Sequence, residues 1–166
     1  LNPIAAMGPQ VDKVTVYSDG RGTNSSIYLN ATLKDGTIIQ RTFMRDNGKI
    51  TEVNHDYFTS NTEGNSKPHI ATAMTEYKKM GVEKVSVHAA LESGGLVWAK
   101  YGFEPNSAAT EKMFKYFKYL GRIGEMTDHK GVVHQISEKE VEAAQKIIMG
   151  KRGINELAKT KLGKKM

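Results

Sequence analysis

The sequence contains no cysteine among its 166 residues. This absence excludes disulfide bonds and thiolate metal sites. The sequence also lacks any apolar run near the roughly 18 residues that a membrane span requires, so we expect no membrane partner. It has no Walker loop, no Gly-x-Ser-x-Gly motif and no dinucleotide fingerprint. These absences are compatible with a cytoplasmic setting. Any functional site would have to use other residue types and motifs.

What is present is an ordinary globular composition with an uneven charge. Hydrophobic residues make up 39% and charged residues 25%, enough for one domain with a real core. The net charge of +6 resides in residues 145–166, where seven basic residues face Glu156 alone. This predicts an acidic partner such as nucleic acid, with a solvated lysine-rich terminus as the alternative.

The first half has the pattern of an antiparallel meander. Residues 1–10 are expected to form a flexible leader, since two prolines and a glycine interrupt any regular pattern. Four β-type runs follow, and Asp-Gly and Asn-Gly pairs separate the last three of them, which is a strong hairpin signal. The runs cover residues 11–17, 26–33, 37–44 and 50–58.

Helices and strands alternate in the middle of the chain. Pro68 suits the first turn of a helix whose apolar face contains Ile70, Ala73, Met74 and Tyr77. A strand over 82–90, a short helix over 91–101 and a strand from Phe103 are predicted next. The remainder is mostly helical, with a capping box at Ser137 and Glu140. We therefore expect an α+β domain over 11–105, with a basic helical extension over 106–166 that packs on this core or trails from it.

The stretch from Ile50 to Pro105 resembles the core of the GNAT acyltransferase superfamily. It has the end of a β-meander, a loop that opens a helix, a strand, a short helix and an aromatic residue four before Gly-Phe. The resemblance implies acetyl-coenzyme A as cofactor and an amine as acceptor. It also implies that the loop and the helix N-terminus hold the coenzyme pyrophosphate. The corresponding residues are Gly64, Asn65, Ser66, Lys67 and His69.

The loop and the aromatic position depart from the family pattern. The loop has one glycine, and Pro68 removes an amide donor. Trp98 stands where the family often has the tyrosine that protonates the leaving thiolate, and an indole N–H cannot do so. Tyr101 is the substitute, while Trp98 and Phe103 are alternatively core anchors.

A general base is expected on the strand before the loop. Strict alternation puts Glu52, Asn54 and Asp56 on one face and Val53, His55 and Tyr57 on the other. Either Glu52, or His55 with a pKa near neutrality, would take a proton from an amine through water. Polar residues on a half-exposed strand are the alternative reading.

A narrower resemblance concerns GNAT-like domains of tailed bacteriophages and mobile elements. The segment GGLVWAKYGF matches the motif of these domains at Gly94, Gly95 and Trp98 through Phe103, with Lys100 at the basic position. The second hypothesis is therefore a non-enzymatic phage protein, acting in the host cytoplasm or packaged in the virion. It would keep the fold and bind DNA or virion proteins through its basic tail. The tail residues are Lys151, Arg152, Lys159, Lys161, Lys164 and Lys165.

Two further patterns bear on partners. Lysine and arginine alternate with aromatic residues over 112–122, which is typical of both phosphate contacts and stacking, although core packing explains several of the rings. Asp128, His129 and His134 sketch a cluster, but no helix puts them on one face, and we expect no metal.

Overall fold

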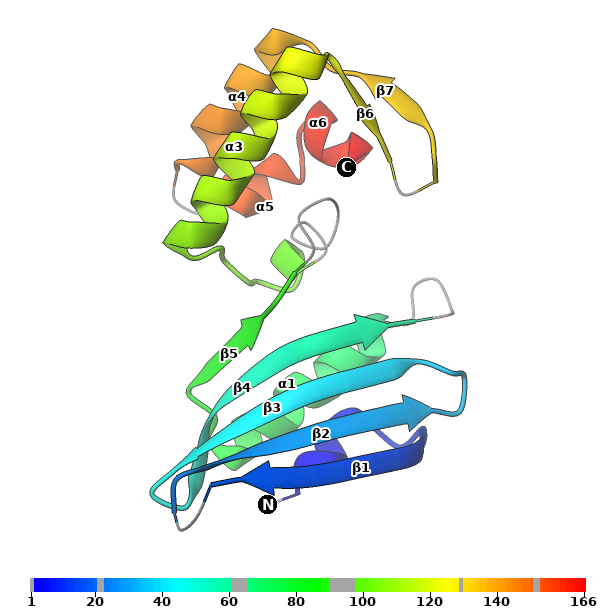
Figure 1. The fold of residues 1–166 in the computed structure, drawn as a ribbon, viewed down its shortest axis with the longest axis vertical. Helices are drawn as coiled ribbons and strands as arrows, with labels where there is room; N and C mark the ends of the chain where they lie inside the picture. The colour runs from blue at the N-terminus through cyan, green and yellow to red at the C-terminus, as the bar shows by residue number, and fades with distance from the viewer. Residues whose placement is uncertain (1, 21–22, 61–65, 90–97, 129, 151–152) are drawn as a thin grey trace. The chain divides into compact units, whose positions relative to one another are not determined.

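The computed structural model describes residues 2–20, 23–60, 66–89, 98–128, 130–150 and 153–166. The chain forms two compact units, Leu1–His88 and Ala89–Met166, shown in Figure 1. The first contains a mixed five-stranded sheet and the second contains most of the helices. The α+β class is confirmed. The units divide after His88, and not after residue 105, where the sequence pattern placed the end of the core.

The sheet of the first unit has the order β1-β2-β3-β4-β5. β1–β4 form an antiparallel meander, and β5 pairs in parallel with β4. Asn47 and Gly48 have φ of 47° and 79° in the β3–β4 turn, a conformation that Asn-Gly favours. The strands are β1 (Val11–Asp19), β2 (Ser25–Leu33), β3 (Ile38–Asp46), β4 (Lys49–Thr59) and β5 (Lys84–Val87).

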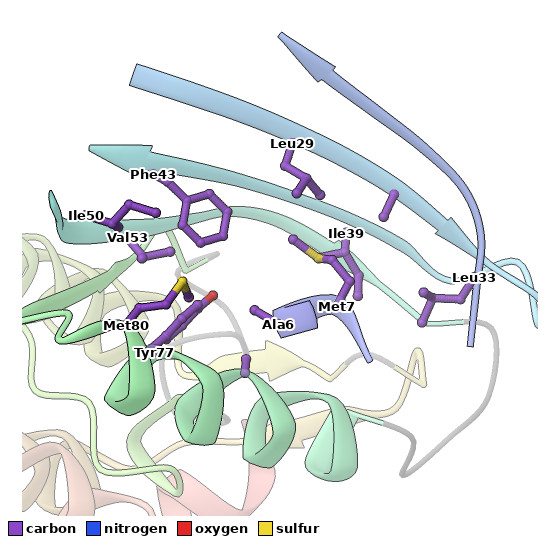
Figure 2. Close-up of a cluster of buried hydrophobic side chains, with 12 residues drawn as sticks. Ala6, Met7, Leu29, Leu33, Ile39, Phe43, Ile50, Val53, Tyr77 and Met80 are labelled. Carbon is purple, nitrogen blue, oxygen red and sulfur yellow. The ribbon is translucent and has the colours of Figure 1, made fainter. Parts of the chain in front are cut away.

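The expected flexible leader is instead part of the core. Residues Pro3–Met7 form a 3₁₀ helix, η1, whose start is capped by the Asn2 side chain. Ala6 and Met7 are fully buried. Figure 2 shows them between the sheet and the helix that follows β4. Pro3 and Gly8 lie at the ends of this short helix and do not disrupt it, and the apolar Ile-Ala-Ala-Met segment between them gains by burial.

That helix is α1 (Ser66–Met80), and it covers the same face of the sheet as η1. Its buried residues are Ile70, Ala73, Tyr77 and Met80, which agrees with the helical spacing in the sequence. Tyr77 packs edge-on against Phe43 of β3, with ring centroids 6.1 Å apart. α1 and η1 therefore cover the core of the first unit on one face of the sheet.

β4 contains two bulges that change which face its residues occupy. Relative to β3, the pairing skips one residue between Ile50 and Glu52 and another between His55 and Tyr57. Val53 and His55 share one face, as strict alternation predicts, and both are buried, but Tyr57 is 49% exposed and Phe58 packs against the core instead. Strict alternation was therefore wrong for Tyr57, because a bulge inserts a residue that has no partner on the neighbouring strand.

The second unit packs helices around its own apolar cluster. α3 begins at the Asn106 cap, and α4 begins with the predicted capping box of Ser137 and Glu140. Buried residues of the unit include Phe117, Leu120, Val141, Ala144, Leu157 and Leu162. Its elements are α3 (Ser107–Ile123), β6 (Glu125–Thr127), β7 (Val133–Gln135), α4 (Glu138–Ile148), α5 (Gly153–Leu157) and α6 (Lys161–Lys165).

The structure differs from the expected elements at two places in the second unit. Among the described residues there is no strand at Phe103, where residues 103–106 lack regular structure. The β6–β7 hairpin was not expected. The predicted helix over 91–101 lies mostly outside the described residues, apart from a helical turn at Trp98 and Ala99.

Candidate functional site

The end of β4 lies beside the start of α1. β5 pairs with β4 from Glu52 to His55, and the last bond runs from the His88 amide to the His55 carbonyl oxygen at 3.3 Å. β4 continues to Thr59, paired in the described part of the chain with β3 alone. The Phe58 ring lies 6.2 Å from the His69 ring in the first turn of α1. Within the described residues, the edge of β4 beyond His55 is thus unpaired and lies near the N-terminus of α1.

Three of the five expected cofactor residues are in this first turn, while Gly64 and Asn65 lie outside the described residues. The first turn has no acidic residue, and Lys67 is exposed there. Burial lowers the pKa of His69, so its imidazole offers a hydrogen bond and no charge at neutral pH. The first amides of a helix have no acceptor within it, although Pro68 contributes none. The first turn of α1 therefore combines one exposed cation, Lys67, with helix amides that have no acceptor within the helix.

His55 is a core residue. Its side chain is 4% exposed, and its Nε2 lies 2.8 Å from the Tyr77 hydroxyl oxygen. Burial, and then the positive charge of Arg41, lower the pKa of His55 to about 3. The expected pKa near neutrality is wrong. His55 is a neutral hydrogen-bonding group that joins β4 to α1.

Sequence reasoning missed Arg41, a guanidinium buried in an apolar core. Arg41 is 2% exposed, and its Nη1 donates to the Ala6 carbonyl oxygen at 3.0 Å. Its guanidinium also lies 5.7 Å from the centroid of the Tyr77 ring. Burial lowers the pKa of Arg41 and raises that of Tyr77 to about 12. The alternation Ile39, Arg41, Phe43 was the signal, because it puts the arginine on the core face.

Glu52 lies on the opposite face of β4 from the core and is partly accessible. Its carboxylate accepts from Ser86 Oγ at 3.3 Å and pairs with Lys84 Nζ at 2.9 Å, both on β5. The Glu52 side chain is 24% exposed. The Glu52 carboxylate is accessible to solvent, but it already forms an ion pair with Lys84.

Tyr101 belongs to the second unit, whereas Glu52 and His55 belong to the first. Its ring contacts Trp98 at 6.2 Å, and Trp98 contacts Phe103 at 5.3 Å. These three rings form a small aromatic cluster around the helical turn at Trp98. Gly94 and Gly95, which carried part of the resemblance, lie outside the described residues.

The C-terminal residues are folded into the second unit. Lys159 pairs with Glu156 at 2.7 Å, and Lys165 binds Glu140 at 2.9 Å and the Gln135 carbonyl oxygen at 2.9 Å. Of the other expected cations, Lys161 and Lys164 are exposed, while Lys151 and Arg152 lie outside the described residues. In the same C-terminal segment, Leu157 and Leu162 are buried. These C-terminal residues are therefore part of the packed structure of the second unit.

Asp128 and His134, from the acidic and histidine cluster in the sequence, are joined across a turn. Asp128 accepts from the amides of Lys130 and Val132 and lies 2.8 Å from His134 Nε2. The bond to His134 is the main cause that lowers the Asp128 pKa to about 2. Within the described residues no group of three or more His, Asp or Glu side chains could hold a metal ion. His129 is not among those residues.

In the part of the chain that the structure describes, no helix has both the length and the apolar character needed to cross a lipid bilayer. Comparison of the chain with protein-family models, with curated proteins and with solved structures found no significant match.

Proposed function

We propose that the first unit binds acetyl-coenzyme A and that the protein transfers its acetyl group to an amine. The observation that carries this proposal is the open edge of β4 beside the first turn of α1, where Phe58 meets His69. The order of β-meander, helix and parallel strand supports it, since the resemblance to GNAT acyltransferases implies that order.

The proposed binding site uses backbone and cationic groups. Lys67 and the first amides of α1 would hold the diphosphate, since the positive end of a helix attracts anions. The edge of β4 over residues 56–59 would offer its backbone groups to the amides of the pantetheine arm. The bound cofactor supplies an activated thioester.

In the transfer step, the amine nitrogen bonds to the acetyl carbon as the carbon–sulfur bond breaks. Glu52 is the proposed base, and it would accept the amine proton through a water molecule. The thiolate would take a proton from water. His55 has no part in this step, because it is buried and its pKa of about 3 makes it too weak a base.

A non-enzymatic role is the second candidate. It is favoured by the engagement of Glu52 with Lys84 and by the loss of His55 as a base. In that case the protein would keep this fold and bind nucleic acid or virion proteins. The exposed Lys161 and Lys164 are the described tail residues suited to such contacts.

The test is the melting temperature with saturating acetyl-coenzyme A, since a ligand that binds only the folded state raises it. We expect an upward shift that ADP, which has the diphosphate without the arm, does not match. Lys67→Gln should reduce the shift, and Lys78→Gln, at the far end of α1, should not. No shift with wild-type protein would refute cofactor binding. A shift without thiol release across a panel of amines would favour the non-enzymatic role.

A further inference from the structure

One face of α3 combines positive charge with an exposed aromatic ring. Lys115, Lys118, Tyr119 and Arg122 follow the spacing i, i+3, i+4, i+7, which puts them on one side of a helix. All four are exposed, and Phe117 and Leu120 are buried on the opposite side. The basic face is therefore the outer face of an amphipathic helix, and the core does not require its aromatic ring.

The four side chains line a depression on the surface. Tyr119 is 48% exposed, and the Arg122 guanidinium lies 5.9 Å from the centroid of its ring. The guanidinium therefore lies over one face of the Tyr119 ring. This arrangement offers an aromatic surface within reach of three cations.

The charge of this face is largely uncompensated. Glu111, one turn before Lys115, pairs with it at 2.7 Å, and both side chains are about two-thirds exposed or more, at 68% and 74%. Among the described residues, Lys118 and Arg122 form no ion pair. Lys112 adds another exposed cation on the flank. An anionic partner would meet at least two cations that no carboxylate neutralises.

We propose that this face of α3 binds single-stranded nucleic acid. Lys115, Lys118 and Arg122 would contact successive phosphates, and an unpaired base would stack on Tyr119. A duplex hides the faces of its bases, so it would use the cations alone. An acidic peptide would have no use for the ring, and a membrane would require a broader apolar surface than this one. The site lies in the second unit and does not depend on the proposed acetyl transfer.

The ring is tested by fluorescence anisotropy with a labelled 20-nucleotide oligothymidine. Tyr119→Ala should weaken binding roughly 5- to 100-fold, the usual effect of removing one stacking platform. Tyr119→Phe keeps the ring and should bind within about twofold of wild type, since stacking does not need the hydroxyl. Equal binding by the alanine variant would overturn the stacking role. Circular dichroism checks that the variants are folded.

The cations are tested by the salt dependence of the same binding. Lys118→Gln with Arg122→Gln should lower the log–log salt slope by about 1.4, or about 0.7 for each phosphate that the variant no longer neutralises. The control is Lys139→Gln with Lys146→Gln, which removes the same charge from exposed positions on α4. If both pairs change the slope equally, the binding reflects net charge alone and the α3 site is refuted.

The nature of the partner is tested by competition. We expect oligothymidine to displace the label at lower concentration than a duplex of the same length, polyglutamate or anionic phosphatidylserine vesicles. Preference for the duplex, the peptide or the vesicles would overturn the proposed occupant. Because acetyl-coenzyme A binding is measured separately by melting temperature, failure of either proposal is distinguishable from failure of the other.

Discussion

The Nε2 atom of His55 lies 2.8 Å from the hydroxyl oxygen of Tyr77, and both side chains are buried in the first unit. The contact joins β4 to α1, and the Arg41 guanidinium lies over the Tyr77 ring beside it. Because burial disfavours charge on the imidazole, the contact holds a neutral histidine in the core.

This neutral histidine predicts a loss of stability in mild acid. The folded-state pKa of His55 is about 3, below its usual 6.5, so the unfolded chain takes up a proton that the folded chain resists. Stability attributable to His55 is complete above pH 6.5 and falls as the pH drops from 6.5 toward 3. At pH 5 the loss should be about 2 kcal/mol. Urea unfolding at pH 7 and pH 5 measures it.

His55→Gln is the matched control, since glutamine keeps a polar side chain but does not titrate. Its free energy of unfolding should change less between the two pH values. An equal pH dependence in both proteins would contradict the assignment. An NMR titration showing a His55 pKa near 6.5 would do so directly.

A second prediction concerns η1. Met7→Ala should lower the free energy of unfolding by about 2–5 kcal/mol, because it leaves a cavity in a packed core. The control is Met149→Ala, at a side chain that is 71% exposed, which should change stability by less than about 0.5 kcal/mol. Urea unfolding checks both variants. If residues 1–10 were a flexible leader, the two substitutions would have equal, small effects.

A third prediction compares two helical glycines in the second unit. A Cβ on Gly163 would lie 2.8 Å from the Leu157 carbonyl carbon, with no room for it, whereas one on Gly121 would lie 3.4 Å from Val141 Cγ1. Gly163→Ala should therefore cost about 1–3 kcal/mol. Gly121→Ala should be neutral or stabilising by up to about 1 kcal/mol, through helix propensity.

Trp98, the only tryptophan, belongs to this unit, so its fluorescence can follow urea unfolding of both glycine variants. Opposite signs are expected for the two changes. Stabilisation by both would show that α6 does not pack on Leu157 as described.

Local signals predicted much of the fold. The four meander strands lie within two residues of their expected limits, because Asn-Gly and Asp-Gly turns set them. The capping box at Ser137 and Glu140 formed as predicted. The features that local patterns missed depend on tertiary contacts. η1 is stabilised by core burial and by the Arg41 bond to Ala6, and no short-range pattern reveals that partner.

The residues with proposed functions also divide into those that local patterns revealed and those that depend on tertiary contacts. The spacing of Lys115, Lys118 and Arg122 on one helical face was visible in the sequence, since helical periodicity is local. The role of His55 was not, because its pKa depends on burial and on Arg41. No local pattern indicated that Lys165 would bind Glu140, which lies on another helix.

Asp56, the unpaired residue of the second bulge in β4, sets which of the next two side chains enters the core. Its exposed side chain accepts a hydrogen bond from Thr42 Oγ1 at 2.6 Å, so a substitution would alter little beyond that bond. Deleting the residue would close the bulge, leave Tyr57 opposite Gln40 and facing solvent, and keep Phe58 toward the core. Forcing Asp56 itself to pair with Gln40 would instead turn Tyr57 toward the core and Phe58 toward solvent. Selection at this position would therefore tolerate the loss of the residue as readily as a change in its chemistry.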